Sequence, residues 1–123
     1  MSTETDRRRR VLFVEDEPGL RQAYQRYFHD RYTVAFAPTG AEARVQMRDF
    51  APDLVVLDLR LPDTDGMDLL RDLRALQPDL RVVVTTSYAS MQPLFEVLGI
   101  PYCGYLVKPF SLTELQAAID AAF

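Results

Sequence analysis

The sequence contains few of the residues that build disulfides and histidine-based metal sites. Its 123 residues include one cysteine, Cys103, and one histidine, His29. A single cysteine excludes an internal disulfide, and a lone histidine has no second histidine with which to share a metal ion. We therefore expect Cys103 to be a small buried residue and His29 to lie at the end of a helix.

Long apolar runs and a surplus of positive charge are also missing. No apolar segment approaches the roughly 20 residues of a membrane-spanning helix, and no secretory signal precedes Arg7. The formal net charge is −4, which gives the chain no general attraction to nucleic acid or to anionic membranes. The one basic run, Arg7–Arg10, is short. We expect residues 1–9 to form a flexible basic tail, and the lack of an export signal favours a cytoplasmic protein.

The sequence does contain five short apolar runs rich in β-branched and aromatic residues, which are typical of buried strands. These runs are Val11–Val14, Tyr32–Phe36, Leu54–Leu57, Val82–Val84 and Tyr105–Val107. Apolar residues at helical spacing lie between them, first over Leu20–Phe28. This alternation of strands and helices predicts one α/β domain, with a parallel sheet and helices on both faces.

Three residues mark where helices begin. Thr39 and Ser111 each precede a glutamate by three residues, which is the pattern of a capping box. Pro18 suits the first turn of a helix, where its missing amide hydrogen is not needed. We expect helices to start at all three places.

The segment Ser90–Gly104 is the exception to this regular pattern. A helix belongs there, but Pro93, Gly99 and Pro101 all interrupt it. We expect the fourth helix to be short or irregular, starting near Pro93 and ending near Gly99.

Polar residues follow four of the five apolar runs at the point where each run ends. They are Glu15 and Asp16, Asp58, Thr85 and Thr86, and Lys108. The run Tyr32–Phe36 continues into Ala37 and Pro38 instead, so we place it at an edge of the sheet. Ligands of parallel α/β sheets bind outside the carboxyl ends of the strands. We therefore expect one pocket formed by Glu15, Asp16, Asp58, Thr86 and Lys108.

Such a pocket has a definite chemistry. Three crowded carboxylates repel one another and resist full ionisation, a penalty that a divalent cation removes. Mg²⁺ suits oxygen ligands of this kind, keeps several waters and leaves room for a phosphate. The lysine and the threonine hydroxyl suit the remaining oxygens of an anion. An aspartate beside Mg²⁺ can also attack phosphorus and form an acyl phosphate.

From about Arg10 to Phe123, the chain resembles the receiver domain of bacterial two-component response regulators, the CheY-like family. The resemblance rests on four motifs in the family's order: VLFVEDEP, PDLVVLDLRLPDTDG, VVVTTSY and GYLVKPF. It implies a receiver domain over residues 10–123. It also implies a flavodoxin-like three-layer sandwich with a five-stranded parallel sheet of order 2-1-3-4-5.

The resemblance assigns the phosphoacceptor and the metal ligands. It makes Asp58 the residue that accepts the phosphoryl group. It implies that Mg²⁺ is bound by Asp16, by Asp58 and by the backbone carbonyl of Arg60. Glu15 supports the same ion, usually through a water molecule.

The resemblance also assigns the residues that bind and sense the phosphoryl group. Lys108 pairs with this group, and the bond from Lys108 to Pro109 is expected to be cis. Thr86 donates a hydrogen bond to a phosphoryl oxygen once the group is attached. Tyr105 fills the aromatic switch position that moves inward together with Thr86.

Four residues near the site have smaller roles. Arg60 and Tyr88 occupy positions that tune how long the phosphoryl group survives, and both are bulky enough to hinder an attacking water. Asp63 and Asp65 follow Asp58 in the same loop. They are better explained as turn and N-cap residues than as metal ligands.

The implied function is a phosphorylation-dependent signalling switch rather than an enzyme acting on a separate substrate. A sensor histidine kinase or a histidine phosphotransfer protein donates the phosphoryl group, and an output partner of unknown identity reads the result. The domain assists its own phosphorylation and dephosphorylation. No direct contact with nucleic acid or membrane is implied, and homodimerisation through the face of the fourth helix is one form of output among relatives.

Other functions fit the sequence less well. A receiver-like binding module that is not phosphorylated is the alternative, favoured only by the irregular fourth helix. An aspartyl phosphatase of the common type has a second aspartate two residues after its nucleophile, where this chain has Arg60. The motifs G-x-x-x-x-G-K-[ST] and G-x-G-x-x-G are both absent, which disfavours nucleotide binding.

Overall fold

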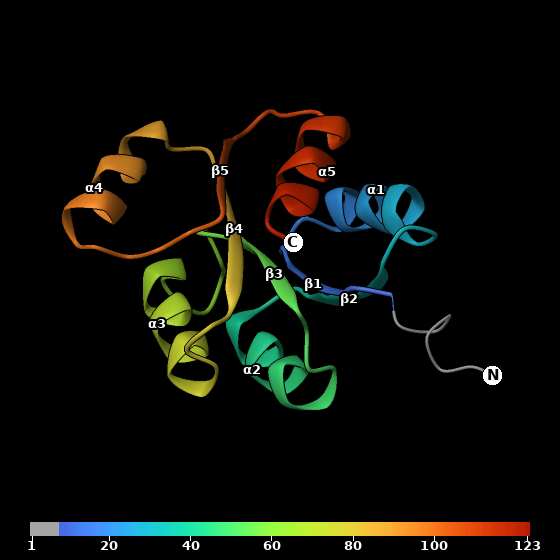
Figure 1. Cartoon of the computed structure of the whole chain (residues 1–123), viewed down its shortest axis with the longest axis horizontal. Coiled ribbons are helices and arrows are strands. Elements are labelled where there is room, and N and C mark those ends of the chain that lie inside the picture. Colours follow the sequence, from blue (N-terminus) through green and yellow to red (C-terminus); the bar gives the residue numbers. More distant parts are fainter. Residues whose placement is uncertain (1–7) are drawn as a thin grey trace.

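The computed structural model describes residues 8–123, except for the side chain of Ser90. The elements in chain order are β1 (Arg10–Val14), α1 (Pro18–Phe28), β2 (Thr33–Ala37), α2 (Gly40–Asp49), β3 (Leu54–Asp58), α3 (Gly66–Leu76), β4 (Arg81–Thr86), the 3₁₀ turn η2 (Ala89–Met91), α4 (Gln92–Val97), β5 (Gly104–Val107) and α5 (Leu112–Ala121). They form three layers, with α1 and α5 on one face of the sheet and α2, α3 and α4 on the other (Figure 1).

The five strands are parallel and lie in the order β2-β1-β3-β4-β5, which confirms the predicted order and places β2 at an edge. The register pairs Val14 with Leu57 and Thr86 with Val107. The carboxyl ends of β1, β3, β4 and β5 therefore lie level with one another. Side chains that follow these strands are brought to one end of the sheet.

Each face of the sheet has its own core. Alternate residues of β3 point to opposite faces, so Leu54 and Val56 join one core while Val55 and Leu57 join the other. The core under α1 and α5 is built around Phe13, which is fully buried. The centre of its ring lies 4.9 to 5.4 Å from the centres of three other rings, those of Tyr24, Phe28 and Phe36.

The helix starts follow the sequence signals with one difference. Pro18 is the first residue of α1, and Ser111 forms both hydrogen bonds of a capping box at α5. Thr39 forms only one of the two, because its side chain accepts from the amide of Glu42 without the reciprocal bond. The capping box expected at Thr39 is thus half formed.

The fourth helix is short, as predicted. Only Phe95 of α4 is buried. The helix ends in a left-handed turn at Gly99, whose φ is 67°. There the amide of Ile100 donates to the carbonyl of Phe95 at 2.9 Å, and the amide of Gly99 donates to that of Glu96 at 3.2 Å. This pair of bonds is a Schellman motif, which ends a helix firmly in one direction.

The described part of the N-terminal tail contacts the end of α1 and the last residue of the chain. Most of the predicted tail, residues 1–7, lies outside the described residues. Arg8 donates to the carbonyl of His29, which caps the end of α1 as expected. The guanidinium of Arg9 lies 4.5 Å from the ring centre of Phe123. Within residues 8–123, no helix is both long and apolar enough for a membrane crossing.

Cys103 is exposed, so the expectation of a buried residue is wrong. It precedes β5, and its amide donates to the carbonyl of Val82 at 2.8 Å. Because β5 is an edge strand and only partly covered, a side chain at its start remains open to solvent.

Candidate functional site

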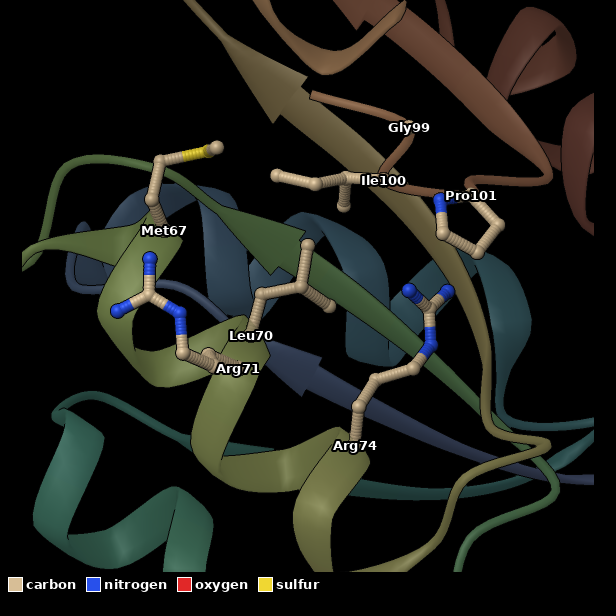
Figure 2. Close-up of a pocket in the computed structure, with 7 residues that line it drawn as sticks. All are labelled: Met67, Leu70, Arg71, Arg74, Gly99, Ile100 and Pro101. Carbon is tan, nitrogen blue, oxygen red and sulfur yellow. The ribbon is translucent and has the colours of Figure 1, made fainter.

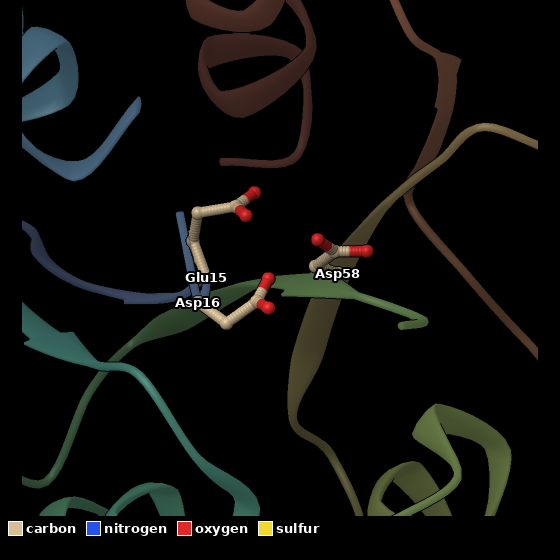
Figure 3. A group of neighbouring side chains, drawn as sticks. All are labelled: Glu15, Asp16 and Asp58. Carbon is tan, nitrogen blue, oxygen red and sulfur yellow. The ribbon is translucent and has the colours of Figure 1, made fainter. Parts of the chain in front are cut away.

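Three carboxylates meet at the carboxyl ends of β1 and β3 (Figure 3). Oxygens of Glu15, Asp16 and Asp58 all lie within 4.8 Å of one another. Glu15 and Asp58 are buried, with 1% and 3% of their surface exposed, whereas Asp16 is exposed. The structure therefore brings these three predicted site residues together, in a cluster with a buried floor and one open side.

Lys108 supplies the positive charge of this cluster. Its Nζ lies 2.9 Å from Oδ2 of Asp58 and 3.1 Å from Oε1 of Glu15. The lysine follows β5, and its own amide donates to the carbonyl of Thr86 at 2.7 Å. The bond to Pro109 is cis, as expected. One ammonium group thus bridges the two buried carboxylates.

The charges of the cluster are not balanced. Burial and then the charge of Asp58 raise the pKa of Glu15 to about 7, although the charge of Lys108 acts in the opposite direction. Burial alone would lower the pKa of Lys108, but the hydrogen bond and charge of Asp58, together with Glu15, raise it. A second cation held by these oxygens would relieve the repulsion. Clustered oxygen donors with an open side suit a hard divalent ion such as Mg²⁺.

Hydrogen bonds hold both buried carboxylates in fixed orientations. Oδ1 of Asp58 accepts from the amide of Arg60 at 2.9 Å, while Oδ2 faces Lys108. Oε2 of Glu15 accepts from the amide of Glu17 at 3.2 Å. Arg21 donates to the backbone carbonyl of Glu15 at 2.9 Å, which fixes the start of this loop to α1.

The loop after Asp58 is anchored at two places. Gly66 donates from its amide to the carbonyl of Leu59 at 3.2 Å, and a Cβ at Gly66 would lie 2.4 Å from the Cα of Leu59. Asp65 caps α3, as predicted, by accepting from the amide of Met67.

Asp63 does more than the turn role expected of it. Its carboxylate accepts from the amides of Gly40 and Ala41, the first residues of α2, at 2.8 and 3.0 Å. These bonds lower the pKa of Asp63. The loop between β3 and α3 thereby caps the N-terminus of α2. No local sequence pattern indicates this contact, because Asp63 and Gly40 are 23 residues apart.

Thr86, Tyr88, Tyr105 and Arg60 form a connected group beside the carboxylates. Oγ1 of Thr86 is buried and accepts from the amide of Tyr88 at 3.1 Å. The hydroxyl of Tyr105 donates to the carbonyl of Tyr88 at 2.7 Å. The Arg60 guanidinium donates to the Tyr88 hydroxyl at 2.9 Å. Tyr88 therefore links the loop after Asp58 to β5, a role that the sequence did not suggest.

The site opens into a small polar cavity of about 210 Å³. Its lining consists of Asp16, Glu17, Asp58, Arg60, Ser87 and Lys108. Four of the predicted site residues are absent from this lining: Glu15, Thr86, Tyr88 and Tyr105. The cavity is large enough for a small anion and its ligands rather than for a nucleotide.

Comparison with known proteins identifies relatives over nearly the whole chain. A family model described as "Response regulator receiver domain" matches residues 11–120. The transcriptional regulatory protein ZraR of Escherichia coli is 36% identical over 91 residues, which cover 74% of this chain and 21% of that protein. The two-component response regulator PhoP of Pseudomonas aeruginosa is 34% identical over 113 residues, or 91% of this chain and 50% of that protein. The chain thus spans between about a fifth and a half of the length of the curated relatives it matches.

Solved structures give the same result. The non-phosphorylated receiver domain of HemR from Leptospira biflexa has a TM-score of 0.81 and 36% identity, with 93% of each chain covered. The response regulator TrrA from Thermotoga maritima, in complex with Mg²⁺ and BeF, has a TM-score of 0.81 and 25% identity. That match covers 94% of this chain and 99% of TrrA.

Proposed function

The chain belongs to the response regulator receiver domain family, and on this basis we propose that it is a signalling switch that accepts a phosphoryl group on Asp58. One observation carries the proposal. Asp58 is a buried carboxylate with one oxygen held by the amide of Arg60 and the other facing Lys108, beside two further carboxylates. A buried acid that served only stability would not need an open cavity and a surplus of negative charge around it.

We propose that the acidic cluster binds Mg²⁺. Asp16, Asp58 and the carbonyl of Arg60 would be its protein ligands, and Glu15 would hold a coordinated water. The donor set fits, because all of its atoms are oxygens and one side of the cluster is exposed. When bound, such an ion neutralises charge on transferring phosphoryl oxygens.

The chain's own residues account for the transfer step. An oxygen of Asp58 attacks the phosphorus of a phosphohistidine, the P–N bond breaks, and the histidine keeps the electron pair and takes up a proton. Lys108 already faces Oδ2 of Asp58 at 2.9 Å, so its ammonium lies where a phosphoryl oxygen would develop charge. Thr86 accepts through its oxygen, which leaves its hydroxyl proton for donation to the attached group.

The donor is a sensor histidine kinase or a histidine phosphotransfer protein. A cavity of about 460 Å³ adjoins the site on the side of α1, and Leu20, Pro109 and Phe110 contribute to its lining. Apolar side chains directly beside Lys108 give a donor protein a surface on which to align its phosphohistidine. We propose that the encounter takes place in the cytoplasm, as for response regulators in general, with residues 10–123 as the folded receiver unit.

The output depends on Tyr88 and Tyr105. When the Thr86 hydroxyl turns toward a phosphoryl oxygen, its hydrogen bond from the Tyr88 amide is weakened. Tyr88 can then shift, and this shift weakens the hydrogen bond from the Tyr105 hydroxyl to the Tyr88 carbonyl. This movement would be passed to α4, where Leu94 and Val97 are exposed together with Leu98, the residue that follows the helix. A second copy of the chain or an output partner would then bind this face. The domain itself would make no direct contact with nucleic acid.

We further propose that the domain assists the hydrolysis of its own acyl phosphate. Water must approach phosphorus through the cavity that Arg60 lines. The 2.9 Å hydrogen bond from Arg60 to the Tyr88 hydroxyl holds the guanidinium across that approach and limits the rate of this hydrolysis. Loss of the Tyr88 hydroxyl would free Arg60 and shorten the lifetime of the phosphoryl group.

Intact-mass spectrometry after incubation with acetyl phosphate tests the proposal. We expect one phosphoryl adduct that requires Mg²⁺, disappears in Asp58→Asn and persists in the control Asp68→Asn, an exposed carboxylate on α3. An adduct that persists in Asp58→Asn would overturn the assignment of Asp58. The absence of any adduct, with or without Mg²⁺, would favour a receiver-like binding module that is not phosphorylated.

A further inference from the structure

A third cavity lies away from the carboxylates, between α3 and the connection from α4 to β5 (Figure 2). Its volume is about 250 Å³. One wall is a stripe of α3, formed by Met67, Leu70, Arg71 and Arg74 at helical spacing. The opposite wall is formed by Gly99, Ile100 and Pro101. Neither the phosphoryl chemistry nor its switch residues use this cavity.

The shape of this cavity is fixed by its two walls. The Schellman motif at the end of α4 holds Gly99 and Ile100 in place through bonds to Glu96 and Phe95. Ile100 packs against the core that contains Phe95 and Leu70. The floor is therefore a preformed apolar surface. Because the protein need not become ordered when a ligand binds, binding has a smaller entropic cost.

Arg74 gives the cavity an unbalanced positive charge. Its Nε donates to the carbonyl of Leu80 at 3.1 Å, and no carboxylate lies within ion-pair distance of its guanidinium among residues 8–123. Burial lowers the pKa of Arg74, which reflects a charge that is partly removed from water without a partner. A guanidinium in this state is a strong site for a carboxylate, because both terminal nitrogens can donate to its two oxygens.

Arg71 flanks the other side of the apolar floor. Its ion pair with Asp68 is 3.3 Å long, and 73% and 63% of the two side chains are exposed. A pair this exposed contributes little and is easily exchanged for another anion. Figure 2 shows the two guanidinium groups on either side of Leu70, with Ile100 and Pro101 opposite.

We propose that this cavity binds a small organic acid, with its apolar body on Met67, Leu70 and Ile100 and its carboxylate on Arg74. The volume is slightly below the range of about 300–1,000 Å³ for drug-sized ligands, so the ligand is short. A protein partner fits less well. The neighbouring α3 residues Asp68, Arg71 and Asp72 are exposed and charged, and they give no continuous apolar surface around the opening.

Hexanoate is the probe that tests this site, with hexanol and acetate as partial ligands. Hexanol keeps the chain without the charge, and acetate keeps the charge without the chain. Nuclear magnetic resonance titration of backbone amides and arginine Nε–H groups locates the binding. We expect hexanoate to shift the signals of Arg74, Gly99 and Ile100, with an affinity roughly tenfold or more above that of either partial ligand.

Variants distinguish a specific carboxylate-binding site from a non-specific hydrophobic surface. Arg74→Met keeps the apolar stem but not the charge, and it should weaken hexanoate binding roughly tenfold or more while leaving hexanol unchanged. Arg74→Lys should bind hexanoate more weakly than the unmodified chain and more tightly than Arg74→Met. Arg26→Met, an exposed arginine on α1 at the other face of the sheet, should change nothing.

Two results would overturn the proposal. One is equal binding of hexanoate and hexanol to the unmodified chain, a comparison that does not depend on the folding of any variant. The other is full hexanoate affinity in a folded Arg74→Met. Because Asp58 takes no part, Asp58→Asn should bind hexanoate as well as the unmodified chain does, so failure here is distinct from failure of phosphorylation.

Discussion

β1 and β5 both supply charged groups to the site around Asp58, but the molecule holds these two strands very differently. Residues Val11–Val14 of β1 are at most 1% exposed and lie between two cores. β5 is an edge strand whose residues are only partly buried, and the helix next to it, α4, buries a single side chain, Phe95. The acidic part of the site is thus rigidly mounted, while the part that carries Lys108 and Tyr105 is loosely covered.

This difference indicates which part of the molecule can move. The roles proposed for the carboxylates, to bind a metal ion and to act as the nucleophile, require fixed positions, and β1 and β3 provide them. A switch needs an element whose two arrangements are close in free energy, which few buried contacts allow. The α4 and β5 side meets that condition. Four predictions test the contrast, from the largest expected effect to the smallest.

The rigid side should depend heavily on Phe13. Phe13→Ala removes a fully buried ring that packs on three others, and we expect it to lower the free energy of unfolding by about 3–5 kcal/mol. Urea unfolding measures the loss. Phe36→Ala, on the edge strand β2 and only partly buried, is the matched control and should cost less. An equal loss in both would show that the centre and the edge of the sheet are held alike.

The loose side should depend on Phe95 in a different way. Phe95→Ala deletes the only buried side chain of α4 and its contacts with Tyr102 and Tyr105, at a cost of about 3 kcal/mol. We expect amide exchange in α4 to accelerate strongly, while acetyl phosphate still modifies Asp58 to the same extent. Loss of phosphorylation in a folded Phe95→Ala would break the proposed division between the two sides.

The packing of α1 and β2 on α5 should depend more modestly on Tyr32. Its hydroxyl donates to the carboxylate of Asp120 across a largely apolar contact. Tyr32→Phe should lower the free energy of unfolding by about 1 kcal/mol, measured again with urea. The control Tyr27→Phe removes a bond from a less buried tyrosine to the neutral side chain of Gln116 and should have a smaller effect. The reverse order would contradict this account of burial.

The smallest effect is expected at Val97, which is 82% exposed on α4. Val97→Ser should change the free energy of unfolding by no more than about 0.5 kcal/mol. If this residue belongs to an output face, the variant should nevertheless weaken self-association or partner binding of the phosphorylated chain, which gel filtration detects. A large loss of stability would show that Val97 supports the fold instead.

Much of this architecture was predictable from local patterns. The five apolar runs fall on the five strands, and Glu15, Asp58 and Lys108 meet at the ends of three of them. Alternation of strands and helices makes the strands parallel, and parallel strands bring their carboxyl ends to the same edge of a sheet. The start of α1 at Pro18 and the short α4 were also predicted, since proline and glycine act on their own neighbours.

What the sequence did not reveal depends on contacts between distant segments. Asp63 caps α2 from another loop, and Tyr88 joins Arg60 to Tyr105, pairings that no spacing rule indicates. Cys103 was misplaced because an apolar run does not state whether its strand lies at an edge. The unpaired charge of Arg74 is equally invisible, since it requires knowing which carboxylates are far away.

The close approach at Gly66 has a consequence for how this chain tolerates change. Any side chain there would push its Cβ against the Cα of Leu59, the residue next to Asp58. Position 66 bears no functional group, yet every replacement would displace the backbone next to Asp58, the proposed phosphoacceptor. In a complete survey of substitutions, position 66 should therefore tolerate replacement as poorly as Asp58 does. The reason is that the backbone of Leu59 leaves room for the hydrogen of glycine but not for a Cβ atom.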